Sequence, residues 1–145
     1  MDNNKLEKIC ELYELELKLL DEYADDINNE EKYNVLQSCH DKRCNLMSSM
    51  SLAEVYEKVK GLNNPLTIEL YMEEAEQQNN DYEQMVLLYT HALEGCRSLY
   101  GEIGEKTIEC KLQIAILIRN ICEQNEEKEL VNNKYTYKMV LQILE

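Results

Sequence analysis

The sequence contains no Trp and no Phe, only one Pro and only four Gly. A β-rich domain needs turn residues between many short strands and an alternation of apolar and polar positions, so this scarcity argues against a sheet. All ten aromatic residues are Tyr. The core must therefore use aliphatic residues, Met, Cys and tyrosine rings whose hydroxyls reach the surface. We expect an all-α protein, and its 145 residues fit one domain.

Long apolar runs are also missing. The longest run, Ile114 to Ile118, is far shorter than the roughly 20 residues that a membrane-spanning helix needs. The chain begins with Met1-Asp2-Asn3-Asn4-Lys5 and no secretory leader, so we expect a soluble, intracellular, cytoplasmic protein, with the nucleus left open. Free Cys on an apolar helical stripe behaves as a small hydrophobic residue. We therefore expect reduced, buried thiols at the six cysteines: Cys10, Cys39, Cys44, Cys96, Cys110 and Cys122.

Basic residues are few. The chain has 15 Lys and Arg against 29 Asp and Glu, a formal charge of −14, and this field opposes contact with nucleic-acid phosphates. No Lys or Arg lies between Lys60 and Arg97. The same stretch contains seven acidic residues: Glu69, Glu73, Glu74, Glu76, Asp81, Glu83 and Glu94. It is either a solvated face that aids solubility or a docking surface for a basic segment of a partner.

Catalytic and metal-binding patterns are incomplete. His40 and Cys44 share a helical face at i, i+4, but Cys39 points elsewhere and no second Cys/His pair completes a zinc site. His91 and Cys96 stand five residues apart, on different sides of a helix, so they form no Cys–His nucleophile. The sequence has no Gly-rich phosphate loop and no Ser/His/Asp set. We expect no enzymatic activity, no cofactor and no metal.

The first half of the chain predicts a helical hairpin. Apolar residues recur at 3-then-4 spacing from Leu6 to Ile27, which indicates one long amphipathic helix. Asn28-Asn29 interrupts it. A weaker stripe follows from Leu36 to Met50, with Arg43 on its apolar face. We assign an N-terminal hairpin to residues 1–50.

Helix start and stop signals organise the next part. Ser51 and Glu54 form a capping box, and Gly61 can end the short helix that follows. This predicts a linking helix over residues 51–61. Asn64 caps the next helix and Pro65 takes its first position, where the missing N–H costs nothing. Four further helices are predicted over residues 65–78, 81–101, 105–124 and 127–144.

The sequence also repeats itself at two spacings. Leu66-Thr67-Ile68-Glu69 resembles Lys106-Thr107-Ile108-Glu109, 40 residues further on. A second correspondence has a spacing of 48 residues and relates Tyr82, Tyr89 and Leu93 to Leu130, Tyr137 and Leu141. Periods of about 20 to 50 residues are typical of helical solenoids, in which each hairpin buries its apolar stripe on a neighbour.

The helix over residues 81–101 carries the clearest motif. Four of its elements are Tyr82, Leu88-Tyr89, Ala92-Leu93-Glu94 and Gly101. They resemble the second helix of the tetratricopeptide repeat in its long form, found in kinesin light chains, although Met85 replaces a small alanine. Ile114-Ala115 lies where that family carries a Leu-Ala pair. The resemblance covers about residues 64–145.

The resemblance implies a short α-solenoid of stacked antiparallel hairpins with about seven helices. An irregular helical bundle is the alternative. We expect a single all-helical domain over residues 1–145, made of the hairpin at 1–50, the linking helix at 51–61 and two tetratricopeptide-like hairpins at 64–145.

These patterns favour a non-enzymatic adaptor or scaffold. The family resemblance implies a groove lined by the first helix of each hairpin, and its acidic bias predicts a protein partner with a basic segment, not a nucleic acid or a membrane. The residues expected to face the partner are Tyr71, Glu74, Gln78, Glu109, Gln113 and Asn120. The competing hypothesis is a structural subunit that assembles with itself or another chain through residues 5–27 as a coiled coil.

Overall fold

The computed structural model describes residues 3–126, which fold into six α-helices and contain no strand. The predicted all-α class is confirmed, whereas the predicted helix over 127–144 lies outside the described residues. The helices are α1 (Asn3–Ala24), α2 (Glu30–Leu46), α3 (Leu52–Lys60), α4 (Pro65–Glu76), α5 (Tyr82–Tyr100) and α6 (Glu105–Glu126). None of these helices is long and apolar enough to cross a lipid bilayer.

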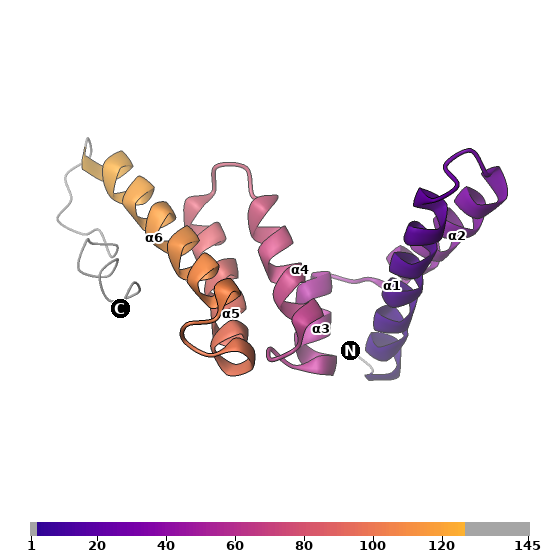
Figure 1. The fold of residues 1–145 in the computed structure, drawn as a ribbon, viewed down its shortest axis with the longest axis horizontal. Helices are drawn as coiled ribbons and strands as arrows, with labels where there is room; N and C mark the ends of the chain where they lie inside the picture. The colour runs from indigo at the N-terminus through magenta and orange to yellow at the C-terminus, as the bar shows by residue number, and fades with distance from the viewer. Residues whose placement is uncertain (1–2, 127–145) are drawn as a thin grey trace. The chain divides into compact units, whose positions relative to one another are not determined.

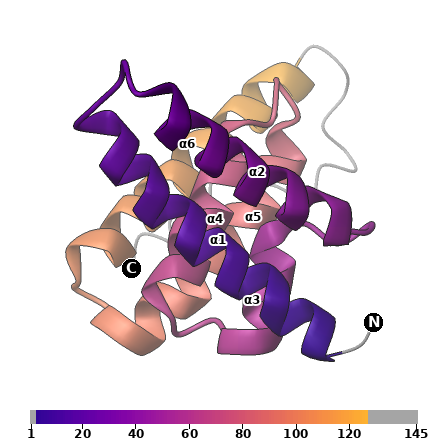
Figure 2. The ribbon, with the colours of Figure 1, turned by 90° about the vertical axis from the view of Figure 1, so that its right-hand side faces the viewer.

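The chain divides into two compact units, Met1–Val59 and Lys60–Glu145. In the first unit, α1 and α2 lie side by side and are joined at one end by a short turn (Figures 1 and 2). Asn29 caps α2 by accepting a hydrogen bond from the Lys32 backbone N–H at 3.1 Å. The break predicted at Asn28-Asn29 is therefore confirmed, and the N-terminal segment is a hairpin.

Helix α3 begins with the predicted capping box. The backbone N–H of Ser51 donates to Glu54 Oε1 and that of Glu54 donates to Ser51 Oγ, each at 3.2 Å. The Tyr56 hydroxyl donates to the Cys10 carbonyl on α1 at 3.0 Å, and the Tyr56 side chain is 1% exposed. The expectation that tyrosine hydroxyls reach the surface is wrong here, because a backbone carbonyl satisfies this one inside the core.

In the second unit, the successive helices α4, α5 and α6 alternate in direction. Helix α5 packs against both α4 and α6, as the magenta-to-orange part of Figure 1 shows. Asn64 caps α4 and Pro65 occupies its first turn, as predicted, but α4 ends at Glu76, two residues earlier than expected. Gly101 ends α5 with a φ of 79°, in the left-handed region that favours glycine.

Close packing between α4 and α5 depends on small residues. Ala75 on α4 and Ala92 on α5 are both fully buried. The Leu62 carbonyl oxygen and the Ile68 side chain lie where a Cβ would stand on Gly95, with Ile68 Cγ1 at 2.9 Å from that position. Gly95 therefore lets the start of α4 approach the α5 backbone.

Residues related by the 40-residue repeat are buried to a similar extent at two positions. Thr67 and Thr107 are both fully buried, and Ala75 and Ala115 are 0% and 6% exposed. A third pair differs, because Ile68 is 1% exposed and Ile108 is 52% exposed. Ile68 lies on the face of α4 that packs on α5.

Candidate interaction surfaces

The residues predicted to contact a partner from α4 do not lie beside α6. Tyr71 is 2% exposed and its ring stacks on His91 of α5, with centroids 4.9 Å apart. Glu74 and Gln78 are half-buried, and Gln78 Nε2 donates to the Glu74 carbonyl at 3.2 Å. At 3.6 residues per turn, Tyr71 and Glu74 lie roughly 200° and 140° around α4 from Glu69. Gln78 lies beyond the end of the helix. Glu69 marks the side of α4 that reaches α6, because it forms an ion pair with Lys106.

The predicted residues on α6 lie on the side of that ion pair. Glu109 is exposed, and Gln113 and Asn120 are half-buried. All three stand within roughly 60° of Lys106 around the helix. The hydrogen bond from Lys106 to Glu69 raises the pKa of the Lys106 amine, so this amine stays charged at neutral pH.

The α4 residues that share the α6 side are acidic. Glu73 and Glu76 stand four and seven residues beyond Glu69, on the same exposed stripe of α4. Helix α4 therefore places Glu73 and Glu76, rather than Tyr71 and Glu74, on the side of the Glu69–Lys106 ion pair, and Glu109 lies on that side of α6. The i, i+4, i+7 spacing of Glu69, Glu73 and Glu76 in the sequence already indicates that these residues share one face of a helix. It does not indicate which helix lies beside that face.

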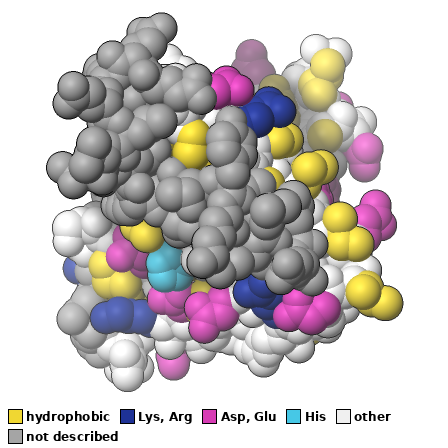
Figure 3. Space-filling model, turned by 90° about the vertical axis from the view of Figure 1, so that its left-hand side faces the viewer, with side chains coloured by type: hydrophobic (Ala, Val, Ile, Leu, Met, Phe, Trp, Pro, Cys, Tyr) yellow, Lys and Arg dark blue, Asp and Glu magenta, His cyan; other side chains and the backbone are white. Residues whose placement is uncertain are grey.

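Basic residues in this unit are already engaged. The four that follow Lys60 within the described residues each have an acidic partner: Arg97 with Glu102 at 3.1 Å, Lys106 with Glu69, Lys111 with Glu102 at 2.8 Å, and Arg119 with Glu123 at 3.9 Å. The hydrogen bond from Lys111 holds the pKa of Glu102 below its usual value. Within the described residues that follow Lys60, the exposed carboxylates without an ion pair are Glu73, Glu76, Asp81, Glu83, Glu94, Glu105 and Glu109. Figure 3 shows acidic side chains spread over the side on which α6 lies.

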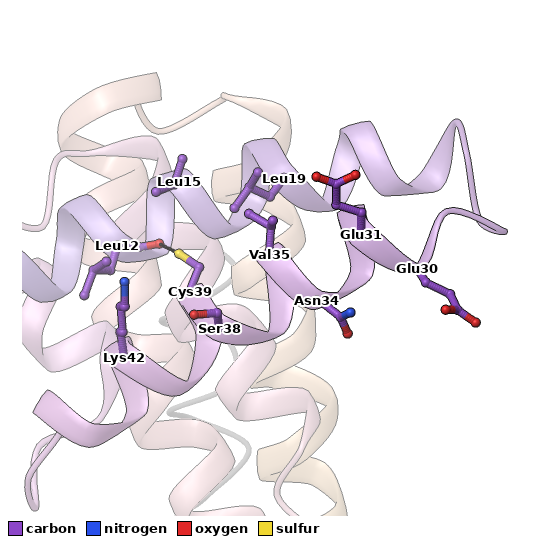
Figure 4. Close-up of a pocket in the computed structure, with 10 residues that line it drawn as sticks. All are labelled: Leu12, Leu15, Leu19, Glu30, Glu31, Asn34, Val35, Ser38, Cys39 and Lys42. Atoms are coloured by element: carbon purple, nitrogen blue, oxygen red, sulfur yellow. Dashed lines mark hydrogen bonds between the residues drawn. The ribbon is translucent and has the colours of Figure 1, made fainter.

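A second surface is an apolar groove on the α1–α2 hairpin, with a volume of about 560 Å³ (Figure 4). Its apolar lining is Leu12, Leu15 and Leu19 from α1 with Val35 and Cys39 from α2. Leu15 and Val35 are 45% and 49% exposed. The Cys39 thiol donates to the Leu12 carbonyl at 3.3 Å and joins the two walls.

The ends of this groove carry opposite charges. Glu30 and Glu31 lie at the end near the α1–α2 turn, and Lys42 lies at the other end (Figure 4). Between these ends the apolar side chains form most of the lining, and the polar residues Asn34 and Ser38 of α2 complete it. The arrangement is thus a hydrophobic strip with a negative and a positive end, a pattern that fits another helix.

A polar cluster lies elsewhere in the same hairpin and explains Arg43 on the apolar stripe of α2. Arg43 Nε donates to Glu16 Oε2 of α1 at 2.6 Å, and its guanidinium lies 5.4 Å from the centre of the Tyr13 ring. His40 Nδ1 lies 2.6 Å from Glu16 Oε1. Burial raises the pKa of Glu16, but the hydrogen bonds to Arg43 and His40 outweigh it, and the net effect is a lowered pKa. Sequence reasoning missed Glu16, because apolar periodicity gives a helix face but not its partner.

The cluster continues to an exposed thiol. Cys44 Sγ lies 3.4 Å from His40 Nε2, so the predicted i, i+4 pairing of His40 and Cys44 is present, while Cys39 points to Leu12. Among the described residues, no group of three or more His, Cys, Asp or Glu is placed to hold a metal ion.

No protein-family model, curated protein or solved structure matches this chain.

Proposed function

We propose that the chain is a non-enzymatic protein-interaction adaptor and that its helices α4, α5 and α6 belong to a tetratricopeptide-like stack. A basic segment of a partner binds along the side shared by α4 and α6. One observation supports this assignment above the others. Among the described residues, every Lys and Arg that follows Lys60 is already paired with an acid, whereas Glu73, Glu76 and Glu109 are exposed and form no ion pair with any of these residues.

The positions of these residues on their helices support a common side for the carboxylates. Glu73 and Glu76 share a stripe of α4 with Glu69, whose ion pair with Lys106 joins α4 to α6. Glu109 lies one turn beyond Lys106 on α6. A partner with several Lys or Arg residues can therefore contact carboxylates of both helices at once.

The energetics predict a salt-sensitive complex. Each exposed ion pair contributes only about 0.2–1 kcal/mol, so affinity requires several contacts together. Such contacts mainly accelerate association and select the sign of the partner's charge. At physiological ionic strength the Debye length is about 8 Å, so only basic residues close to the α4–α6 side contribute strongly.

Fluorescence anisotropy with a labelled peptide of alternating Lys and Ser residues tests the proposal. The Glu73→Lys/Glu109→Lys variant is expected to bind about fivefold more weakly than the unaltered chain at 0.05 M salt, because two attractive contacts become repulsive. The matched control is Glu83→Lys/Glu94→Lys, which makes the same change in net charge on exposed positions of α5. Equal weakening by both variants would show that net charge alone attracts the peptide and would overturn the site.

A further inference from the structure

The groove on the α1–α2 hairpin is a separate surface from the α4–α6 side. Leu15 and Val35 are about half exposed at its centre, and Leu12, Leu19 and Cys39 complete its apolar lining. We propose that the same groove of a second copy of this chain covers it, so that two α1–α2 hairpins form an antiparallel four-helix bundle. This inference goes beyond the adaptor function, and neither depends on the other.

The spacing of the leucines is self-complementary. Leu15 lies at the middle of the α1 wall, with Leu12 three residues before it and Leu19 four residues after it. A two-fold axis that lies in the interface and crosses the groove near Leu15 places the two Leu15 side chains against each other. It also places Leu12 of each copy against Leu19 of the other. Contacts of this kind define an isologous dimer interface.

The charges at the groove ends select this orientation. Rotation about an axis that crosses the groove brings Lys42 of each copy to Glu30 and Glu31 of the other, so that both ends form opposite-charge contacts. Rotation about an axis that runs along the groove brings Lys42 to Lys42 and the glutamates to the glutamates. Like-charge contacts are destabilising, so the antiparallel arrangement is favoured.

The same pattern argues for a second copy rather than for an unrelated helix. Any occupant must present apolar residues between a basic end and an acidic end. The α1–α2 face carries that pattern itself, with Leu12, Leu15 and Leu19 between Lys42 and Glu31. The complementary surface is thus already encoded in the chain.

The size of the interface predicts a weak dimer. Helix α2 has 17 residues, which corresponds to roughly 25 Å of length, and two adjacent helices are roughly 20 Å wide. Each copy can then bury about 500 Å², or about 1,000 Å² in total, which is the low end for specific complexes. We expect a dissociation constant of about 10–100 µM.

Sedimentation equilibrium of the full chain tests the inference between 5 and 500 µM in 0.15 M NaCl, where repulsion between two chains of −14 charge is screened beyond about 8 Å. The average mass should rise above the monomer value of 17.1 kDa with concentration. The Leu15→Lys variant should remain monomeric throughout. The matched control is Leu20→Lys, which changes another exposed leucine of α1 outside the groove lining and should still dimerise. A monomeric unaltered chain at 500 µM, or dimerisation of Leu15→Lys as strong as that of the unaltered chain, would overturn the inference.

A charge exchange tests the orientation. Lys42→Glu should weaken dimerisation about tenfold, because it places acidic residues at both ends of the groove. The Glu30→Lys/Glu31→Lys/Lys42→Glu triple variant reverses the charge of both ends and should recover most of the affinity. Far-UV circular dichroism confirms that each variant keeps its helices. A triple variant that dimerises as weakly as Lys42→Glu would contradict the antiparallel arrangement. All these variants leave Glu73, Glu76 and Glu109 unchanged, so a failure here is distinguishable from a failure of peptide binding.

Discussion

The Glu16 carboxylate on α1 lies 2.6 Å from Nε of Arg43 on α2, and the same carboxylate contacts His40 Nδ1 at 2.6 Å. The Arg43 side chain is 11% exposed, so Glu16 compensates a nearly buried charge in the interface of the hairpin. Removing one partner of such a pair leaves the other charge unpaired in a poorly hydrated site. Glu16 therefore holds α1 and α2 together in this register.

Replacement of Glu16 by Gln should lower the free energy of unfolding by about 1.5–3 kcal/mol, the usual range for a hydrogen bond to a charged group. Urea denaturation followed by circular dichroism measures the loss, and hydrogen exchange with mass spectrometry should localise it to α1 and α2. Glu14→Gln is the control, because Glu14 is an exposed acid on the same helix. An equal loss in both variants would contradict the role assigned to Glu16.

The same carboxylate predicts a pH dependence. The folded-state pKa of Glu16 is lowered, so the carboxylate binds its proton less readily in the folded chain than in the unfolded chain, where its pKa is about 4.3. Its stabilising contribution is then fully present above the unfolded pKa and is lost as the pH falls through the folded pKa. The stability difference between the unaltered chain and Glu16→Gln should be largest near neutral pH and should shrink below about pH 4. A difference that stays constant from pH 7 to pH 3 would exclude this linkage.

Local signals in the sequence located the helices well. The Ser51–Glu54 box, the Asn64 cap and Gly101 predicted helix ends that the structure contains, because a cap needs only residues within one turn. The second helix was the weaker prediction, since its stripe contains Arg43, and Arg43 is accommodated only by a residue 27 positions away.

Longer-range relationships could not be read from periodicity. The predicted contact set on α4 included Tyr71, which is buried against His91. A stripe on a helix identifies a face, but the identity of the neighbouring helix is set by the packing of the whole unit. The Glu69–Lys106 ion pair supplies that missing information and moves the candidate site to Glu73 and Glu76. The hydroxyl of Tyr56 was missed for the same reason, since its acceptor belongs to α1.

Gly95 provides a test of the packing between α4 and α5. A methyl group there would overlap the Leu62 carbonyl oxygen and press on Ile68. The backbone before α4 must shift, so Gly95→Ala should destabilise the chain by about 1–3 kcal/mol despite the better helix propensity of alanine. Urea denaturation measures the change, with Ser98→Ala at an exposed position of α5 as the control. A stabilised Gly95→Ala variant would show that the helices can separate without cost.

The six thiols should differ sharply in reactivity. Cys44 is exposed, whereas Cys10, Cys39, Cys96, Cys110 and Cys122 are buried. Alkylation requires both access and the thiolate form, and burial raises the pKa of Cys110 to about 12, which leaves almost no thiolate at neutral pH. Brief treatment with iodoacetamide at pH 7.5, followed by peptide mapping, should therefore modify Cys44 first and nearly alone.

Two comparisons make this expectation specific. The Cys44→Ser variant should show almost no rapid alkylation, and urea should expose the five remaining thiols together with the loss of helix signal. Since Cys39 and Cys44 occur on the same helix, their contrast tests the placement of that helix directly: Cys39 hydrogen-bonds to Leu12 inside the hairpin, whereas Cys44 lies beside His40 at its surface. Rapid alkylation of Cys39 in the folded chain would mean that α2 does not pack on α1 as described, and both the Glu16–Arg43 ion pair and the groove would lose their basis.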